Sequence, residues 1–327
     1  MPHDDSRSTA RRPRRARRSR PQPDLVQQQP YDTAADLTGA VGLEGARHFS
    51  DVAYARIAGF RPLLLSLAVP VAATAAEPVP VVLYLHGGAF LWGAHNDPLF
   101  GIGSALLARG IAVASAQYRL LGEALYPAAQ HDVSAAIRWL KTEGPSLGLD
   151  ATRVGVMGES AGGHLAVFAG TNSTDAALNG SIGAQGTDAT VSAAVGWYPV
   201  TDFSLYDDDP FPADAPPVEQ WPAPIRPDGA PSAYDIARWA SPVNHVTASA
   251  APMLLVHGDA DTTVPLEHSH VLASALSAVG VDAELVVVPG GEHVFPGMKT
   301  GWISARTAAF FAERLQSRDG EPSAAHG

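Results

Sequence analysis

The sequence VGVMGESAGGHLA, residues 154–166, decides the fold of this chain. The apolar run 153–157 predicts a buried strand, and the apolar segment 161–169 that follows predicts a helix. Only Gly158-Glu159-Ser160 separates the two, so the chain must turn sharply from strand to helix with Ser160 at the turn. A parallel strand that feeds directly into a helix is the basic unit of a layered α/β fold.

The glycines on either side of Ser160 indicate what this turn is for. Gly158 and Gly162 complete a G-x-S-x-G pattern, in which neighbours with side chains would clash and the serine hydroxyl projects from the edge of the sheet. The turn also places the Ala161 N–H at a helix N-terminus, where it can stabilise a developing negative charge. These residues predict a serine nucleophile with one backbone donor beside it.

Strands and helices alternate along the rest of the chain. We predict strands over 47–57, 63–69, 79–85, 111–117, 153–157, 192–198, 252–257 and 283–288. We predict helices over 99–109, around 133–140, over 161–169, around 272–279 and over 302–315. This alternation predicts an α/β fold with a mostly parallel central sheet, helices on both faces and a partial lid.

The predicted catalytic domain covers residues 41–317, between two tails. Residues 1–40 are rich in Arg, Gln and Pro and are expected to be disordered, and residues 318–327 are expected to be a flexible tail. Within the domain, the pattern of elements lapses over 200–246, a segment rich in proline and acidic residues. Long irregular loops inside a compact domain are usually functional, so we interpret 200–246 as a lid or pocket insertion.

Charge and composition exclude several classes of function. The net charge is −11, although residues 1–20 hold eight arginines and two aspartates, so the predicted domain is strongly acidic. Binding to nucleic acid needs clustered positive charge, and we expect no such partner. The chain has no cysteine, which excludes disulfides and thiolate metal sites.

One apolar stretch could be mistaken for an export signal. Residues 62–76, PLLLSLAVPVAATAA, resemble a signal core. Cleavage after them would remove the first predicted strands, so we interpret the stretch as a strand and expect a cytoplasmic protein. We expect no membrane span, because no apolar run is long enough.

A glycine-rich loop follows the strand 79–85. The sequence His86-Gly87-Gly88-Ala89-Phe90 is an HGGG-type loop with alanine in the fourth place. The two glycines let backbone amides approach a substrate carbonyl closely, so Gly87, Gly88 and Ala161 are the predicted oxyanion hole. We interpret His86 as a structural hydrogen-bonding residue.

The base should follow the acid along the chain, and four histidines do so: His268, His270, His293 and His326. His293 lies just after the last predicted strand, where a base is expected. His268 and His270 could form an H-x-H metal pair, but at that spacing they point to different faces of a helix. We therefore expect both on a solvated surface and predict no metal site.

Two aspartates compete for the role of the acid. Asp259 and Asp261 both follow the strand 252–257. We prefer Asp261, further along the loop, to orient the tautomer of His293 while His293 takes the proton of Ser160. Asp259 would instead cap backbone amides.

With these residues in place, the chain resembles the hormone-sensitive-lipase-like branch of the α/β-hydrolases. It looks most similar to bacterial esterases of the bifunctional acetylxylan/feruloyl type. The resemblance covers roughly residues 45–317 and rests on HGGAF (86–90), QYRLLGEALYPAAQHDV (117–133), GESAGGHLA (158–166), WYPVTDF (197–203), HGDADTTVP (257–265) and GGEHVF (290–295).

The resemblance implies Asp261 as the acid and no required cofactor. Tyr118-Arg119 and Tyr126-Pro127 would be structural elements behind the site. Two features depart from the family: Ala89 replaces a glycine, and 203–235 has no motif that aligns. Our candidates for lining the substrate pocket are Ala89, Phe90, Glu159 and Trp197.

The leading hypothesis is a carboxylesterase for short acyl or aryl esters that works through an acyl-enzyme. The family resemblance adds the acetyl or feruloyl groups of plant polysaccharide as substrates. The alternatives are an arylformamidase or amide hydrolase with the same triad, and a non-catalytic binding protein on the same fold. The expected partner is a small-molecule ester, and a homodimer is compatible with the sequence.

Overall fold

The computed structural model describes residues 45–97, 99, 101–206 and 233–316. The expected tails over 1–40 and 318–327 lie outside these residues, as does most of the expected lid. The domain boundaries and the lid therefore stay predictions.

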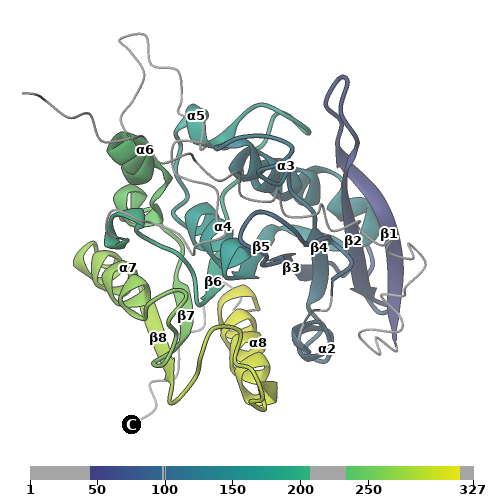
Figure 1. Cartoon of the computed structure of the whole chain (residues 1–327). Helices are drawn as coiled ribbons and strands as arrows, with labels where there is room; N and C mark the ends of the chain where they lie inside the picture. The colour runs from purple at the N-terminus through teal and green to yellow at the C-terminus, as the bar shows by residue number, and fades with distance from the viewer. Residues whose placement is uncertain (1–44, 98, 100, 207–232, 317–327) are drawn as a thin grey trace, which may run out of the picture. The chain divides into compact units, whose positions relative to one another are not determined.

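The described residues form a mostly parallel sheet of eight strands in the order β1-β2-β4-β3-β5-β6-β7-β8 (Figure 1). The strands are β1 Ala46–Ala55, β2 Leu63–Pro70, β3 Val79–Leu85, β4 Ala112–Ala116, β5 Leu149–Glu159, β6 Ala193–Trp197, β7 Met253–Gly258 and β8 Ala283–Val288. Strand β2 pairs antiparallel with both β1 and β4, and every pairing from β4 to β8 is parallel.

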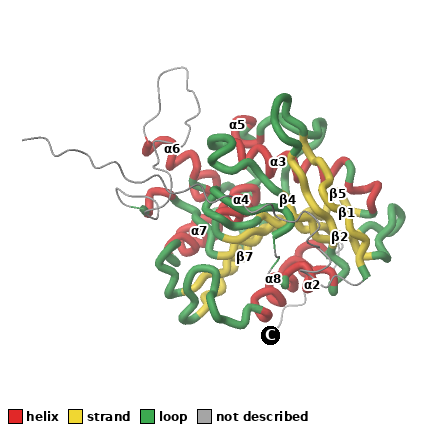
Figure 2. Tube along the Cα trace, turned by 45° about the vertical axis from the view of Figure 1, so that its right-hand side comes forward, coloured by secondary structure: helices red, strands yellow, loops and turns green. Residues whose placement is uncertain are grey.

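Helices cover both faces of this sheet (Figures 1 and 2). They are α2 Ile102–Leu107, α3 Ala128–Thr142, α4 Ala161–Gly170, α5 Ala176–Asn179, α6 Ala233–Ala240, α7 Glu267–Ala278 and α8 Gly301–Leu315. Apolar side chains of α3, α4 and α7 join one buried cluster, and those of α2 and α8 join a second cluster on the opposite face. The predicted α/β class, with a mostly parallel sheet and helices on both faces, is confirmed.

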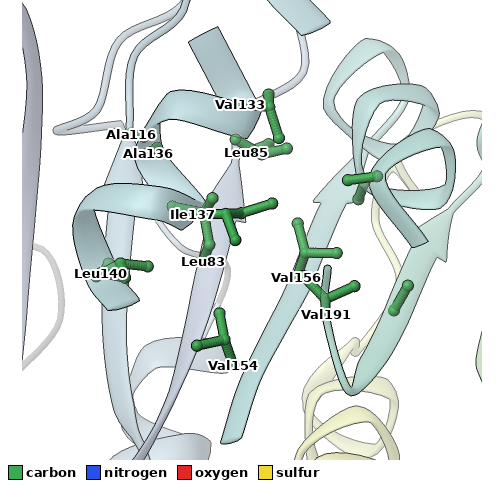
Figure 3. Close-up of a cluster of buried hydrophobic side chains, with 14 of the residues drawn as sticks. Leu83, Leu85, Ala116, Val133, Ala136, Ile137, Leu140, Val154, Val156 and Val191 are labelled. Carbon is green, nitrogen blue, oxygen red and sulfur yellow. The ribbon is translucent and has the colours of Figure 1, made fainter. Parts of the chain in front are cut away.

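Helix α3 shows how the apolar periodicity of the sequence builds this core. Its buried side chains recur at helical spacing: Val133, Ala136, Ile137 and Leu140. Figure 3 shows them against Leu83 of β3 and Val154 and Val156 of β5. Parallel strands that are covered on both faces need apolar side chains on both faces, which explains the near-continuous apolar run of β3.

Replacing Ile137 by alanine should destabilise the domain by about 2–5 kcal/mol, because it leaves a cavity in a side-chain cluster that cannot collapse fully. The free energy of unfolding in denaturant measures this change. Val71→Ala is the control: the Val71 side chain is 61% exposed, so its loss should change stability by less than about 0.5 kcal/mol. Equal effects of the two substitutions would contradict this description of the core.

Two expectations from the sequence need correction. The segment 200–246 was expected to be irregular, but α6 lies within it, and Ile236 and Ala240 of that helix pack against Val200 and Phe203. The prolines around this short helix hide its periodicity in the sequence.

The expectation of a solvated His268 is also wrong. His268 is fully buried, and its Nδ1 accepts hydrogen bonds from the backbone N–H groups of Thr201 and Asp202, each at 3.3 Å. His270, two residues further along α7, is exposed as expected. The spacing argument was correct in placing the two side chains on different faces of the helix, but one of those faces packs against the segment after β6.

Candidate active site

Ser160 lies at the turn between β5 and α4, with the strained backbone angles φ 50° and ψ −117°. Glycine is required on either side of Ser160 because neighbouring backbone atoms approach these positions too closely for a side chain. A Cβ at Gly162 would lie 2.1 Å from the carbonyl oxygen of Leu85, and a Cβ at Gly158 would lie 2.3 Å from the Gly162 backbone. The G-x-S-x-G pattern therefore lets the turn pack against the end of β3.

Three side chains from separate loops meet at this turn. His293 Nε2 lies 3.0 Å from Ser160 Oγ, and His293 Nδ1 lies 2.7 Å from Asp261 Oδ2. Asp261 follows β7 and His293 follows β8, and the parallel strands bring both loops to the edge of the sheet where Ser160 lies. The serine hydroxyl can donate to Nε2 while Nδ1–H donates to the carboxylate, which is the geometry of an activated nucleophile.

The Asp261 carboxylate is buried and fixed by backbone donors. Its Oδ1 accepts hydrogen bonds from the N–H groups of Thr263 and Val264, both at 2.9 Å. Burial alone would raise the pKa of Asp261, but hydrogen bonds from His257, His293 and the Val264 amide outweigh it and hold this pKa well below its ordinary value. The carboxylate is therefore ionised at neutral pH and can orient a histidine.

The other aspartate of this loop, Asp259, bonds to a backbone amide and not to His293. The Asp259 side chain is exposed, and its Oδ1 accepts a hydrogen bond from Gly290 N at 2.6 Å. Of the two aspartates, Asp261 is the one that reaches His293.

His257 supports the acid loop, although the sequence motifs did not mark it as a candidate. The imidazole is fully buried, with Nε2 2.8 Å from the Val264 carbonyl oxygen and Nδ1 2.7 Å from Ser269 Oγ. It thus ties the loop that carries Asp261 to helix α7. The signal was the histidine that opens HGDAD, at the carboxyl end of a buried strand.

The glycine-rich loop after β3 bends sharply over the elbow. Gly88, Ala89 and Phe90 have consecutive positive φ angles of 112°, 51° and 61°. A Cβ on Gly88 would lie 2.2 Å from the Trp92 carbonyl oxygen, and a Cβ on Gly87 would lie 3.6 Å from the Cβ of Ser160. The backbone of this loop therefore approaches the serine closely, as donors to an oxyanion must.

Glu159 is buried beside this loop, not exposed in a substrate pocket. Its carboxylate accepts hydrogen bonds from the hydroxyls of Tyr198 at 2.7 Å and Tyr84 at 3.0 Å. Burial raises the pKa of Glu159, and hydrogen bonds from Tyr198, Tyr84 and the Gly87 backbone oppose that rise. Because the Gly87 amide is turned toward this carboxylate, the geometry favours Gly88 and Ala161 as the donors to an oxyanion.

Trp197 does not line the site either. Its indole packs in the cluster on the α2 and α8 face, and Nε1 donates to Thr307 Oγ1 at 3.0 Å. Successive side chains of a strand point to opposite faces of the sheet, and this one points away from α4. Only the backbone of Trp197 contributes to the elbow, by accepting a hydrogen bond from Ser160 N at 2.9 Å.

Of the four pocket candidates, Phe90 lines a cavity. Its ring meets that of His164 edge to face, with 5.5 Å between the ring centroids. Leu121 and Tyr126, from the loop after β4, line the same cavity. Ala89 is not among the residues that line it.

The described part of the chain was also searched for clustered metal ligands and for membrane-spanning helices. No three histidine, aspartate or glutamate side chains gather among these residues in an arrangement that could hold a metal ion. Among the helices described, none combines the length and apolar character needed to cross a bilayer.

Comparison with known proteins places these features in a family. Esterase LipC of Mycobacterium tuberculosis (strain ATCC 25618 / H37Rv) is 30% identical over 246 residues, which are 74% of this chain and 60% of LipC. Ethyl acetate hydrolase of Pseudomonas putida is 29% identical over 233 residues, 66% of each protein. The chain spans between about half and two thirds of the length of these and two further curated relatives that it matches.

A solved structure shares the fold closely. A truncated carbohydrate esterase from gut microbiota aligns with a TM-score of 0.69 and 27% identity, over 83% of this chain and 97% of that one. The BD-FAE family model matches residues 67–276, well over half of the chain, and this range includes the glycine-rich loop, Ser160 and Asp261. The resemblance seen in the motifs is thereby confirmed, and the chain belongs to the BD-FAE family of α/β-hydrolases.

Proposed function

We propose that this chain is a serine carboxylesterase that hydrolyses short-chain acyl or aryl esters. Ser160 is the nucleophile, His293 the general base and Asp261 the residue that orients it. The observation that carries the proposal is the continuous set of hydrogen bonds from Ser160 Oγ through the His293 ring to the buried Asp261 carboxylate.

The reaction follows from the positions of these groups. His293 Nε2 accepts the Ser160 proton as Oγ attacks the ester carbonyl carbon, and the negative oxygen that forms is met by the amides of Gly88 and Ala161. His293 then donates this proton to the leaving alcohol, and the acyl group stays bound to Ser160 Oγ as an acyl-enzyme. Water attacks the acyl group by the same route in reverse, with His293 again as the base.

The class of substrate is supported by the family and by the names of relatives. An ethyl acetate hydrolase is similar in sequence and a carbohydrate esterase shares the fold, and both names describe cleavage of carboxylic esters. The proposed substrates of this chain are therefore small carboxylic esters, including acetyl or feruloyl esters of plant polysaccharide. A cytoplasmic location is supported by residues 63–70, the apolar part of the signal-like stretch, which form β2 between β1 and β4.

The test is a panel of substrates with the purified full chain. We expect hydrolysis of p-nitrophenyl acetate and butyrate and of methyl ferulate, with kcat/KM at least tenfold above that for N-formylkynurenine. A p-nitrophenyl alkylphosphonate should label the protein once, and peptide mass spectrometry should place the label on Ser160. Faster turnover of N-formylkynurenine would identify an amide hydrolase. If the folded protein turned over no substrate and took up no label, the binding-protein alternative would be favoured.

A further inference from the structure

The two hydrogen bonds of the His293 side chain leave one motion of its ring poorly restrained. Nδ1 meets Asp261 Oδ2 at 2.7 Å and Nε2 meets Ser160 Oγ at 3.0 Å. Rocking of the ring about the line that joins these two partners changes the hydrogen-bond angles more than the distances. A hydrogen bond weakens steeply when it bends, so a base has to keep its lone pair aimed at the serine proton. The tilt of the ring therefore needs a third contact.

The ring of Tyr198 supplies such a contact. Its centroid lies 4.8 Å from that of the His293 ring, with 63° between the two planes, and 5.1 Å from that of Phe295, with 76° between the planes. Aromatic rings at these distances and angles pack favourably edge to face. Tyr198 is 2% exposed and Phe295 is 3% exposed. The imidazole of the base thus packs against the protein interior on this side.

The Tyr198 side chain is fixed at its outer end as well as at its backbone. Its hydroxyl donates to Glu159 Oε2 at 2.7 Å, and its N–H donates to the Val256 carbonyl oxygen at 2.7 Å. The other oxygen of the Glu159 carboxylate accepts the Tyr84 hydroxyl at 3.0 Å. A ring that is bonded at its hydroxyl and packed on its edge has little freedom to turn, so it is a rigid support for a neighbouring ring.

The same carboxylate connects this support to the rest of the site. Glu159 directly precedes Ser160, and it also accepts a hydrogen bond from the Gly87 amide of the glycine-rich loop. The nucleophile, the loop with the oxyanion donor Gly88 and the ring beside the base therefore share one buried anchor.

Backbone strain occurs on both sides of the contact between the rings. Tyr198 has a φ angle of 39°, and Val294 and Phe295, the two residues after the base, have φ angles of 59° and 52°. Bulky and β-branched residues rarely adopt such angles. Strain of this kind persists only where the surrounding structure imposes it, and it clusters at active sites. The strain indicates that the position of these rings is held at a local cost.

We propose that Tyr198 is a positioning residue for the base: its ring sets the tilt of the His293 imidazole, and the Glu159 carboxylate holds that ring in place. The inference rests on the proposed function of Ser160 and His293. Because Tyr198 is buried, it acts through His293 and not on the substrate. Its loss should therefore lower kcat and leave KM nearly unchanged.

The test separates the ring of Tyr198 from its hydroxyl. Tyr198→Leu removes the ring and should lower kcat for p-nitrophenyl butyrate about 10- to 100-fold with KM within about threefold of wild type, because a misplaced catalytic group reduces the rate more than the binding. Tyr198→Phe keeps the ring and loses one hydrogen bond, so kcat should stay within about fivefold. Active sites are counted by uptake of the phosphonate label, so that unfolded protein does not enter kcat. Equal losses in the two variants would overturn the role of the ring.

Two further variants are the matched controls. Tyr84→Phe removes a hydroxyl from the same carboxylate, but from β3, on the other side of β5 from Tyr198, and kcat should fall no further than in Tyr198→Phe. Phe310→Leu removes a ring that is also 2% exposed and lies in the same apolar cluster. It should lower the free energy of unfolding and keep kcat within about twofold of wild type. A loss of kcat in either control as large as in Tyr198→Leu would overturn the inference.

Nuclear magnetic resonance of the imidazole gives a readout that does not depend on turnover. In the full chain with isotope-labelled histidine, the Nδ1–H that His293 donates to Asp261 should give a downfield proton signal, assigned by its absence in His293→Gln. This signal should broaden or vanish in Tyr198→Leu and persist in Tyr198→Phe. A wild-type chain that shows this dependence but hydrolyses no ester would contradict the proposed function alone. An active chain whose kcat and imidazole signal both survive the loss of the ring would contradict the positioning role alone.

Discussion

Ser160→Ala should lower kcat/KM for p-nitrophenyl butyrate by at least about 10⁴-fold, because the variant lacks the hydroxyl that forms the acyl-enzyme. The Ser160 hydroxyl is the group that meets His293 Nε2, and the strained backbone at this position projects it from the end of β5. Alanine keeps the Cβ and accepts the same backbone angles as serine, so folding should be retained. Initial rates under pseudo-first-order conditions measure the loss.

The control is a serine of the same kind away from the elbow. Ser277, exposed on α7, should tolerate alanine with kcat/KM within twofold of wild type. Residual turnover of about 10³-fold over the uncatalysed reaction is compatible with the proposal, since backbone donors and binding still act without the nucleophile. Full activity of well-folded Ser160→Ala would exclude Ser160 as the nucleophile.

The architecture could be predicted because it depends on patterns that are local in the sequence. Each parallel strand is a short apolar run and each core-facing helix repeats at about 3.6 residues, so the elements from β2 to α8 were largely located in advance. The elbow was predictable for a related reason, because glycines two positions before and after Ser160, at the boundary between a strand and a helix, are typical of this turn. Helix α6 was missed because its partners, Val200 and Phe203, lie far from it in sequence.

The surroundings of the site depend on contacts between distant residues, which no single window of sequence contains. Trp197 was a candidate for the pocket, but the alternation along β6 turns its ring toward Thr307. Glu159 was assigned there for its place beside Ser160, yet two tyrosine hydroxyls hold it in the interior. In both cases the position along the chain was correct and the direction of the side chain was wrong.

Substituting Asp261 by asparagine should lower kcat by on the order of 10⁴-fold while the fold is retained. If the amide oxygen accepts from the N–H groups of Thr263 and Val264, the amide NH2 faces His293 Nδ1 as a donor. In the opposite orientation a neutral oxygen faces Nδ1 in place of the carboxylate. A donor there favours the tautomer with the proton on Nε2, which cannot accept the proton of Ser160.

Asp259→Asn is the matched control, since it makes the same chemical change two residues away in the same loop. Asp259 accepts a hydrogen bond from Gly290 N and does not reach His293, so its substitution should change kcat by no more than about fivefold. Comparable losses in both variants would mean that activity depends on the loop as a whole, and a larger loss in Asp259→Asn would exchange the roles of the two aspartates.

The stability of Asp261→Asn as a function of pH supplies a readout independent of activity. The folded-state pKa of Asp261 lies below its unfolded value of about 3.9, so the ionised carboxylate stabilises the fold above that pH, and this contribution is lost as the pH falls toward the folded-state pKa. Asparagine cannot titrate. The difference in the free energy of unfolding between wild type and variant should therefore be constant from about pH 6 to 8 and shrink progressively below about pH 4. A difference that does not change with pH would mean that the carboxylate is not held ionised by His293, His257 and the Val264 amide, and the electrostatic argument for its orienting role would fail with it.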